Sequence, residues 1–176
     1  MSSPTPTVPR LGRRAPLNVL IADDDDRSRE ELAGAIAALG HACTTAREGA
    51  EAWELHRAKG FDVILSDWMM PYMDGLELCR RARAEAGEGY TYFIMLTSLT
   101  DRAHVIEALK EGVDDYLTKP LDLEQLQAKL RSASRITALH RGLSRSNASL
   151  KRASDRAFAA ARTDPLTEVG NRLRLQ

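Results

Sequence analysis

Four groups of chemically reactive side chains follow apolar stretches of the sequence, where β-strands are expected to end. They are the acidic run Asp23–Asp26, then Asp67, the hydroxyl pair Thr97–Ser98, and Lys119 with Pro120 after it. In an open parallel sheet, ligands bind at the carboxyl ends of the strands. We therefore expect these groups to lie close together in one site.

The residue types in this set favour phosphoryl transfer. Crowded carboxylates repel one another unless a cation neutralises them. Ligands that are all oxygen suit Mg²⁺, which binds through one or two carboxylates together with water and substrate phosphate. A lysine and a threonine hydroxyl facing that metal complete a cradle for a phosphoryl group. An aspartate is then the nucleophile within reach, and its attack gives an acyl phosphate.

Each of these features also has a simpler interpretation when it is taken alone. A run of four aspartates is commonly a solvated loop or the start of a helix, and Asp67 could cap the next turn. Asp25 and Asp26 are expected to be such N-terminal caps for the following helix. It is the placement of all the groups at the ends of successive strands that favours a site.

The pattern of apolar residues predicts an α/β fold. Short apolar runs alternate with segments of helical period and predict strands near 18–22, 41–46, 61–66, 92–96 and 115–118, and helices near 27–39, 48–59, 75–86 and 101–111. Gly40, Gly60 and Gly112 follow three of these helices, where a left-handed residue is expected. The alternation requires crossover connections and hence a parallel sheet with helices on both faces. Five such units fit a five-stranded sheet of order 2-1-3-4-5.

Composition and charge restrict the class of protein. Two separate cysteines, no signal-peptide pattern and no long apolar run predict a cytoplasmic protein with no membrane span. The net charge is zero, but residues 17–120 hold 11 basic and 20 acidic residues, and residues 121–176 hold 11 basic and 5 acidic residues. An acidic body with a basic tail raises the question of nucleic-acid binding.

The region after Pro120 predicts one extended helix. Apolar or small residues recur with the 3,4 spacing of a coiled coil, and the seam includes Ile136, Leu139, Leu143 and Leu150. An earlier stripe, offset by one residue, is Leu123, Leu126, Leu130 and Ala133, and we expect it to pack on the preceding domain. A helix of this kind needs a partner, because helical stability comes mostly from packing. We therefore expect a homodimer through the later seam.

Five motifs in this order resemble the response-regulator receiver family: VLIADDD, SDWMMPYMDG, MLTS, DDYL and TKP. The resemblance covers residues 17–135. It implies that Asp67 is the phosphoacceptor, and that Mg²⁺ is held by Asp67, Asp24, Asp23 through water, and the Met69 backbone carbonyl. It further implies Thr97 as the switch hydroxyl, Lys119 as the partner of the phosphate, Tyr116 as the aromatic that follows Thr97, and a cis peptide before Pro120.

Two details of the resemblance concern the acids and the lifetime of the phosphoryl group. Asp25 and Asp26 leave open a shift of one residue in assigning the direct metal ligand. Met69 lies two residues after Asp67, and Leu99 lies two residues after Thr97. Both side chains are apolar, so neither can orient a hydrolytic water. We expect a long-lived phosphoryl group.

The residues from Asp164 to Arg172 resemble the opening turn of a GGDEF diguanylate cyclase domain, D-x-L-T-x-L-x-N-R, with Val169 in place of the usual leucine. The catalytic body of that family is absent from this chain. The expected parts are therefore a flexible arm (1–16), a receiver domain (17–135), a coiled-coil linker helix continuing the fifth receiver helix (136–162) and an incomplete GGDEF-type start (163–176).

Together these features imply a two-component response regulator. It would accept a phosphoryl group on Asp67 from a sensor histidine kinase or phosphotransfer protein and signal as a homodimer, through a receiver face and the C-terminal helix, to a diguanylate cyclase output. As given, the chain would be no enzyme beyond its own phosphorylation and dephosphorylation. A stand-alone receiver and dimerisation module remains an alternative.

A DNA-binding regulator is the third alternative. Arginines spaced four apart, such as Arg141 with Arg145 and Arg152 with Arg156, resemble a basic helix face. Most of them fall at outer positions of the heptad, and DNA-reading basic regions precede their zipper rather than lie along it. The pattern therefore disfavours nucleic acid as a partner.

Overall fold

The computed structural model describes residues 15–85, 89–98 and 110–162, with side chains up to 159. One parallel sheet has the strand order β2-β1-β3-β4-β5, which confirms the predicted topology. Its strands are β1 (Asn18–Ala22), β2 (Ala42–Ala46), β3 (Val63–Asp67), β4 (Tyr92–Ser98) and β5 (Asp115–Lys119).

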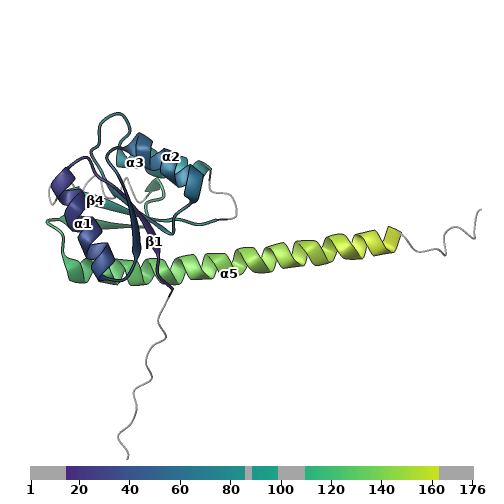
Figure 1. Cartoon of the computed structure of the whole chain (residues 1–176). Helices are drawn as coiled ribbons and strands as arrows, with labels where there is room; N and C mark the ends of the chain where they lie inside the picture. Colours follow the sequence, from purple (N-terminus) through teal and green to yellow (C-terminus); the bar gives the residue numbers. More distant parts are fainter. Residues whose placement is uncertain (1–14, 86–88, 99–109, 163–176) are drawn as a thin grey trace, which may run out of the picture. The chain divides into compact units, whose positions relative to one another are not determined.

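Helices cover both faces of this sheet, as predicted. They are α1 (Asp26–Ala38), α2 (Gly49–Lys59), α3 (Gly75–Ala84) and α5 (Leu123–Arg162). Helices α1 and the start of α5 lie on one face, and α2 and α3 lie on the other (Figure 1). The helix expected at 101–111 falls almost wholly outside the described residues. No described helix has the length and apolar character that a membrane crossing needs.

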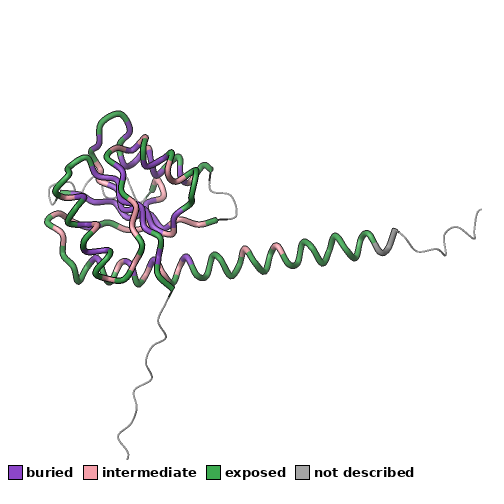
Figure 2. The backbone as a smooth tube through the Cα atoms, in the orientation of Figure 1, coloured by how far each residue is buried: buried purple, intermediate pink, exposed green. Residues whose placement is uncertain are grey.

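The core has two halves, one on each face of the sheet, and β1 shows how the sequence builds both. Val19 and Ile21 belong to the apolar cluster under α1 and α5, whereas Leu20 and Ala22 belong to the cluster under α2 and α3. Successive strand residues point to opposite faces, so a fully apolar strand is buried on both sides. Figure 2 shows the sheet as the buried centre of the molecule. Packing on both faces thereby holds the strands in place, and with them the residues at their carboxyl ends.

Strand and turn boundaries differ slightly from the expectation. Strand β4 extends to Ser98, because Thr97 pairs with Thr118 and Ser98 with Lys119 of β5. The hydroxyl pair therefore lies within the strand instead of after it. Gly40, Gly60 and Gly112 all have positive φ, as expected. Gly60, however, has a ψ of 148°, outside the left-handed helical region.

The first turns of helix α5 pack on the apolar cluster beneath α1. Leu126, Leu130 and Ala133 are buried, as predicted, and Thr137 continues this stripe with 1% of its surface exposed. Leu123 is exposed because it begins the helix. Ile136, assigned to the dimer seam, instead packs partly buried against the apolar cluster under α1 and α5.

Beyond Thr137 the chain forms a second unit, from Ala138 onward. Its part of α5 exposes Leu139, Leu143, Leu150 and Phe158, and no side chain described between 138 and 159 is buried. Arg141, Arg145 and Arg152 share this helical segment with the exposed apolar row. The expected GGDEF-like residues, 163–176, and most of the expected arm, 1–14, lie outside the described residues.

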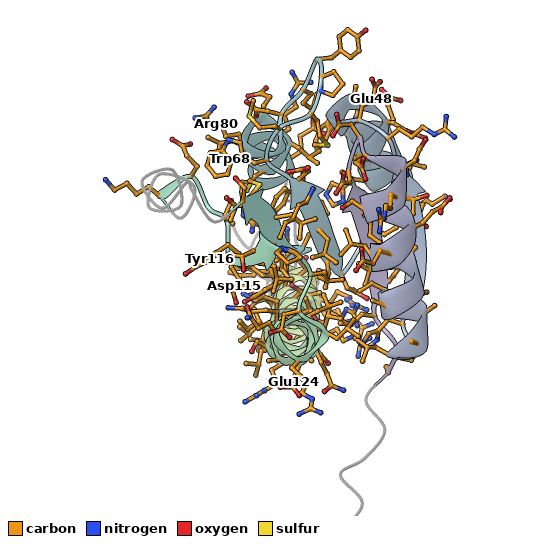
Figure 3. The ribbon with its side chains drawn as sticks, turned by 90° about the vertical axis from the view of Figure 1, so that its left-hand side faces the viewer. Glu48, Trp68, Arg80, Asp115, Tyr116 and Glu124 are labelled. Atoms are coloured by element: carbon orange, nitrogen blue, oxygen red, sulfur yellow. The ribbon has the colours of Figure 1, made fainter. Side chains whose placement is uncertain are left out.

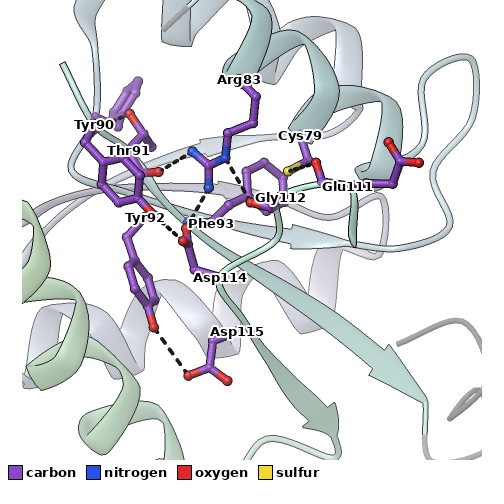
Figure 4. A network of polar contacts seen from close by, with 11 residues as sticks. Cys79, Arg83, Tyr90, Thr91, Tyr92, Phe93, Glu111, Gly112, Asp114 and Asp115 are labelled. Atoms are coloured by element: carbon purple, nitrogen blue, oxygen red, sulfur yellow. Dashed lines mark hydrogen bonds and ion pairs between the residues drawn. The ribbon is translucent and has the colours of Figure 1, made fainter. Parts of the chain in front are cut away.

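Arg83 of α3 ties together the loops that precede β4 and β5 (Figure 4). Its guanidinium donates to the carbonyls of Gly112 at 2.9 Å and Thr91 at 2.7 Å, and forms an ion pair with Asp114 at 2.6 Å. The Asp114 carboxylate also accepts from the Phe93 amide, at 2.7 Å, and from the Tyr90 hydroxyl. Burial, followed by this bond to Asp114, raises the pKa of Tyr90. The network anchors the amino ends of both strands.

Replacing Asp114 with Asn should destabilise the fold, because an amide N–H₂ would then face groups that are themselves donors. We expect a loss of about 2–3 kcal/mol in the free energy of unfolding, measured by urea denaturation. Glu77→Gln is the matched control, because Glu77 forms an exposed pair with Arg81 on one helix, and such pairs contribute less than about 0.5 kcal/mol. Equal losses in the two variants would contradict this role.

Candidate functional site

The site lies at the carboxyl ends of β1, β3 and β5. Asp23 directly follows β1, Asp67 is the last residue of β3, and Lys119 is the last residue of β5. One carboxylate oxygen from each of Asp23, Asp24 and Asp67 lies within 4.8 Å of the others. The sheet order places β1 beside β3, so the fold brings together acids that are 43 or 44 positions apart in the printed sequence.

Lys119 is the cation that faces these acids. Its Nζ lies 2.5 Å from Asp67 Oδ2 and 2.9 Å from Asp23 Oδ2. Burial by itself would lower the pKa of Lys119, but the bonds to Asp67 and Asp23 outweigh it and raise the pKa. The ammonium therefore stays charged and bridges two of the three carboxylates.

Asp23 is the most enclosed of the acids, with 0% of its surface exposed. Its carboxylate accepts from the Ser28 hydroxyl at 2.6 Å and from the Asp25 amide at 3.0 Å. Arg29, itself buried, donates to the Asp23 backbone carbonyl at 2.7 Å and forms an ion pair with Asp26. Helix α1 therefore holds Asp23 through both its backbone and its side chain.

The first turn of α1 also distinguishes the acids from one another. Asp25 is the N-cap, as expected, and accepts from the Ser28 amide at 2.7 Å. Asp26 is the first helical residue rather than the cap. The carboxylate cluster contains Asp23 and Asp24 but neither of these two. The geometry thus favours Asp23 and Asp24 as the acidic pair over a pair shifted by one residue along the chain.

The cluster fits a hard divalent cation. Three carboxylates carry more negative charge than one ammonium can offset, and their oxygens suit Mg²⁺. Asp24 is exposed and Asp23 is buried, so the two acids offer different access to an ion. The chemistry of the donor set therefore matches the expected cofactor.

A glycine allows the loop after Asp67 to close against β3. A Cβ added to Gly75 would lie 2.2 Å from the Asp67 carbonyl oxygen and 2.8 Å from Met95 Sδ, so no larger residue fits there without a shift. Asp74 precedes it and caps α3 by accepting from the Glu77 amide at 2.7 Å. In the Asp-Gly pair after Asp67, the aspartate thus caps α3 and the glycine gives the space for the loop to approach β3.

The other expected site residues lie around this centre. Thr97 is buried, and its hydroxyl donates to the Ser98 carbonyl at 3.2 Å. Tyr116 is 42% exposed, at the surface of β5 (Figure 3). Its ring lies 5.7 Å from Lys129 Nζ. Met69 is exposed, the Lys119–Pro120 peptide is cis, and Leu99 lies outside the described residues.

Sequence reasoning missed Ser28 and Arg29, which contact Asp23 from α1. Both lie in the first turn of the helix that follows the acidic run. Their closeness to Asp23 in the sequence could therefore have suggested a contact. What the sequence alone does not provide is the direction of these side chains, which depends on how α1 starts at Asp25.

Replacing Lys119 with Met should destabilise the protein when divalent cations are removed, because Asp23 and Asp67 then lose their shared counter-charge. We expect a loss of about 1–3 kcal/mol, reduced from the fully buried case because Lys119 is partly exposed. Since the pKa of Lys119 is raised above its ordinary value of 10.5, this stability is present below pH 10.5 and lost as the pH rises through the raised value.

Urea denaturation of both proteins, with EDTA and then with Mg²⁺, measures this effect. Mg²⁺ should recover more stability in Lys119→Met than in wild type, because the ion replaces the missing positive charge. Equal stabilities in EDTA would contradict the assigned role of Lys119.

Comparison with known proteins identifies relatives of this chain. Residues 19–131 match the family described as response regulator receiver domain. The chain is 35% identical over 127 residues to response regulator MprA of Mycobacterium sp. (strain KMS), covering 72% of this chain and 54% of that protein. It is 37% identical over 116 residues to a chemotaxis protein CheY homolog of Campylobacter jejuni subsp. jejuni serotype O:23/36 (strain 81-176), covering 65% of this chain and 89% of that protein.

A solved structure agrees with these relatives. The Francisella response regulator 1452 receiver domain superimposes with a TM-score of 0.63 and 36% identity, covering 69% of this chain and 98% of that one. The present chain spans about half the length of the MprA relatives. Receiver domains bind Mg²⁺ at an acidic pocket and accept phosphoryl groups from histidine kinases. From the family match, the sequence identity and the shared fold, the chain belongs to the response regulator receiver domain family.

Proposed function

We propose that Asp67 is the phosphoacceptor of this receiver. The observation that carries the proposal is the placement of Asp67 at the end of β3, 2.5 Å from Lys119 Nζ and within the carboxylate cluster. A carboxylate oxygen, an ammonium group and acids that could hold a cation then lie at one point. This is the combination that phosphoryl transfer requires.

The residues have separate roles in the proposed transfer. An Asp67 oxygen attacks phosphorus, the bond from phosphorus to the donor's nitrogen breaks, and the donor's imidazole leaves. Asp23, Asp24, Asp67 and the Met69 carbonyl would hold Mg²⁺, which neutralises charge on the phosphoryl oxygens when bound. Lys119 exchanges part of its contact with Asp67 for the phosphoryl group, and the Thr97 hydroxyl turns from Ser98 toward it.

The apolar character of Met69 favours a slow return to the unphosphorylated state. Met69 lies two residues after Asp67, is exposed, and offers no group that would orient a water for attack. Leu99 has the matching position after Thr97 in the sequence. We therefore propose that the phosphoryl group persists long enough to act on a downstream partner.

Asp67→Asn should abolish labelling by a small phosphodonor such as acetyl phosphate in Mg²⁺, because an amide cannot form the acyl phosphate. Intact-protein mass spectrometry should show one phosphoryl group on wild type and none on the variant. Chelation of Mg²⁺ should suppress the label on wild type. Asp62→Asn is a control outside the cluster and should label normally.

Equal labelling of wild type and Asp67→Asn would contradict the proposal. So would a label on wild type that is unaffected by chelating the metal. Loss of the label within seconds, with no phosphatase present, would contradict the proposed long lifetime while leaving the phosphoacceptor assignment intact.

The proposed output passes from the receiver to α5. Movement of Thr97 would draw in Tyr116, now exposed, and so change the surface formed by β5 and the start of α5, where Lys129 contacts both Tyr116 and Asp115. We propose that receivers pair through this face and that the second unit pairs through the row Leu139, Leu143 and Leu150. Ser146 and Ala153 alternate with these leucines, and a seam this weak can hold two packings of similar energy.

The domain beyond the helix is proposed from sequence alone. Asp164, Leu166, Thr167, Asn171 and Arg172 resemble the start of a GGDEF domain, so we propose a diguanylate cyclase as the output of the whole protein. Its position after a long helix is consistent with control through the geometry of a dimer. A longer reading frame that encodes the GG(D/E)EF loop would support this, and one that encodes a different domain would replace it.

Leu143→Asp should weaken dimerisation, because it places two like charges in the proposed seam. We expect the dimer dissociation constant, measured by analytical ultracentrifugation, to rise by about tenfold or more, or about 1.4 kcal/mol. Ala148→Asp adds the same charge at an outer heptad position and should leave the constant almost unchanged. A wild-type chain that is monomeric both before and after phosphorylation would contradict the proposal.

A further inference from the structure

The bonding of Asp23 shows which of its oxygens remains available. Oδ2 accepts from the Ser28 hydroxyl at 2.6 Å and from Lys119 Nζ at 2.9 Å, and Oδ1 accepts from the Asp25 amide at 3.0 Å. An ionised carboxylate has about four acceptor positions, two on each oxygen. Three are therefore used by the protein, and the fourth is on Oδ1.

We propose that Ser28 is a positioning residue for the metal site. Its hydroxyl fixes the rotation of the Asp23 carboxylate, so that Oδ2 stays on Lys119 and Oδ1 keeps the acceptor position through which Asp23 would help to hold Mg²⁺. Neither the receiver motifs nor the expected site residues assign any role to this side chain. The inference rests on the proposed magnesium site and deepens it by naming what orients one of its acids.

The rest of the helix start does not account for this contact. Asp25 already caps the Ser28 amide, so the hydroxyl is not needed to cap α1. A serine inside a helix commonly bonds a backbone carbonyl of its own helix, as Ser132 does with Ala128 at 3.3 Å. Ser28 instead bonds the one fully buried acid of the cluster. The bond therefore orients the Asp23 carboxylate and is not part of the capping of α1.

A neighbouring cavity affects how this role must be tested. Ser28 and Lys119 both line a cavity of about 200 Å³ between α1 and the end of β5. Polar side chains such as Glu31, Ser28 and Lys119 form part of its otherwise largely apolar wall, and a water could bond to them. In Ser28→Ala, a water could take the place of the missing hydroxyl. A larger apolar substitution is the sharper variant.

Ser28→Thr and Ser28→Val form a matched pair, because they share one shape and differ only in the hydroxyl. We expect Ser28→Val to weaken Mg²⁺ binding by about tenfold, as loss of a group that orients a metal ligand commonly does. Ser28→Thr should stay within about twofold of wild type, since it keeps the donor. Isothermal titration of each protein with Mg²⁺ alone gives the dissociation constants.

Two controls separate positioning from folding. Melting in EDTA should occur at a lower temperature for Ser28→Val than for Ser28→Thr, because valine removes a hydrogen bond to a buried carboxylate, and both variants should remain folded at the temperature of the titration. Ser132→Ala should bind Mg²⁺ as wild type does. If wild type binds Mg²⁺ and the valine and threonine variants bind it equally well, the positioning role is overturned and the magnesium site stands. If wild type binds no Mg²⁺, the proposed site and this inference both fail.

Discussion

Three clustered carboxylates, two of them bridged by the ammonium group of Lys119, are the constraint on which the rest of this structure depends. Asp23 has no exposed surface and lies with Asp67 at the end of an apolar sheet, where charge is poorly solvated. Lys119 offsets part of that charge, and the remainder makes the site receptive to a divalent cation. The parallel sheet is what allows this arrangement, because it brings the carboxyl ends of separate strands to one edge. The proposed function and the electrostatic cost of crowded charge thus involve the same few side chains.

The surrounding elements hold that charged edge in place. On one side, the first turn of α1 fixes Asp23 through Ser28 and Arg29. At the opposite end of the strands, Arg83 anchors the starts of β4 and β5 through carbonyls and Asp114. Between them, the two apolar clusters keep the strands in register. A rigid sheet of this kind would let a small change at Asp67 reach the surface of β5, as the proposed output requires, instead of being absorbed locally.

The parts of the fold that depend on local pattern were predictable from the sequence. The parallel sheet and the meeting of Asp23, Asp67 and Lys119 at its carboxyl edge follow from alternating strands and helices. The strand order was chosen from the few that such sheets adopt. The contacts of Ser28 with Asp23 and of Ile136 with the core were not predictable in this way. Each depends on the rotation of a helix against the sheet, which heptad spacing and residue type do not fix. Strand β4 extended to Ser98 for a similar reason, since pairing with β5 determined its end.

The central claim is that the phosphoryl group is carried by one carboxylate among several that lie close together. Its most direct test is to label the protein with a small phosphodonor, trap the acyl phosphate by reduction with borohydride, and locate the reduced residue by peptide mass spectrometry. The account predicts that the reduced residue is Asp67 alone, and that it appears only when Mg²⁺ is present. Reduction at Asp23 or Asp24, or a label on a residue outside this cluster, would contradict it.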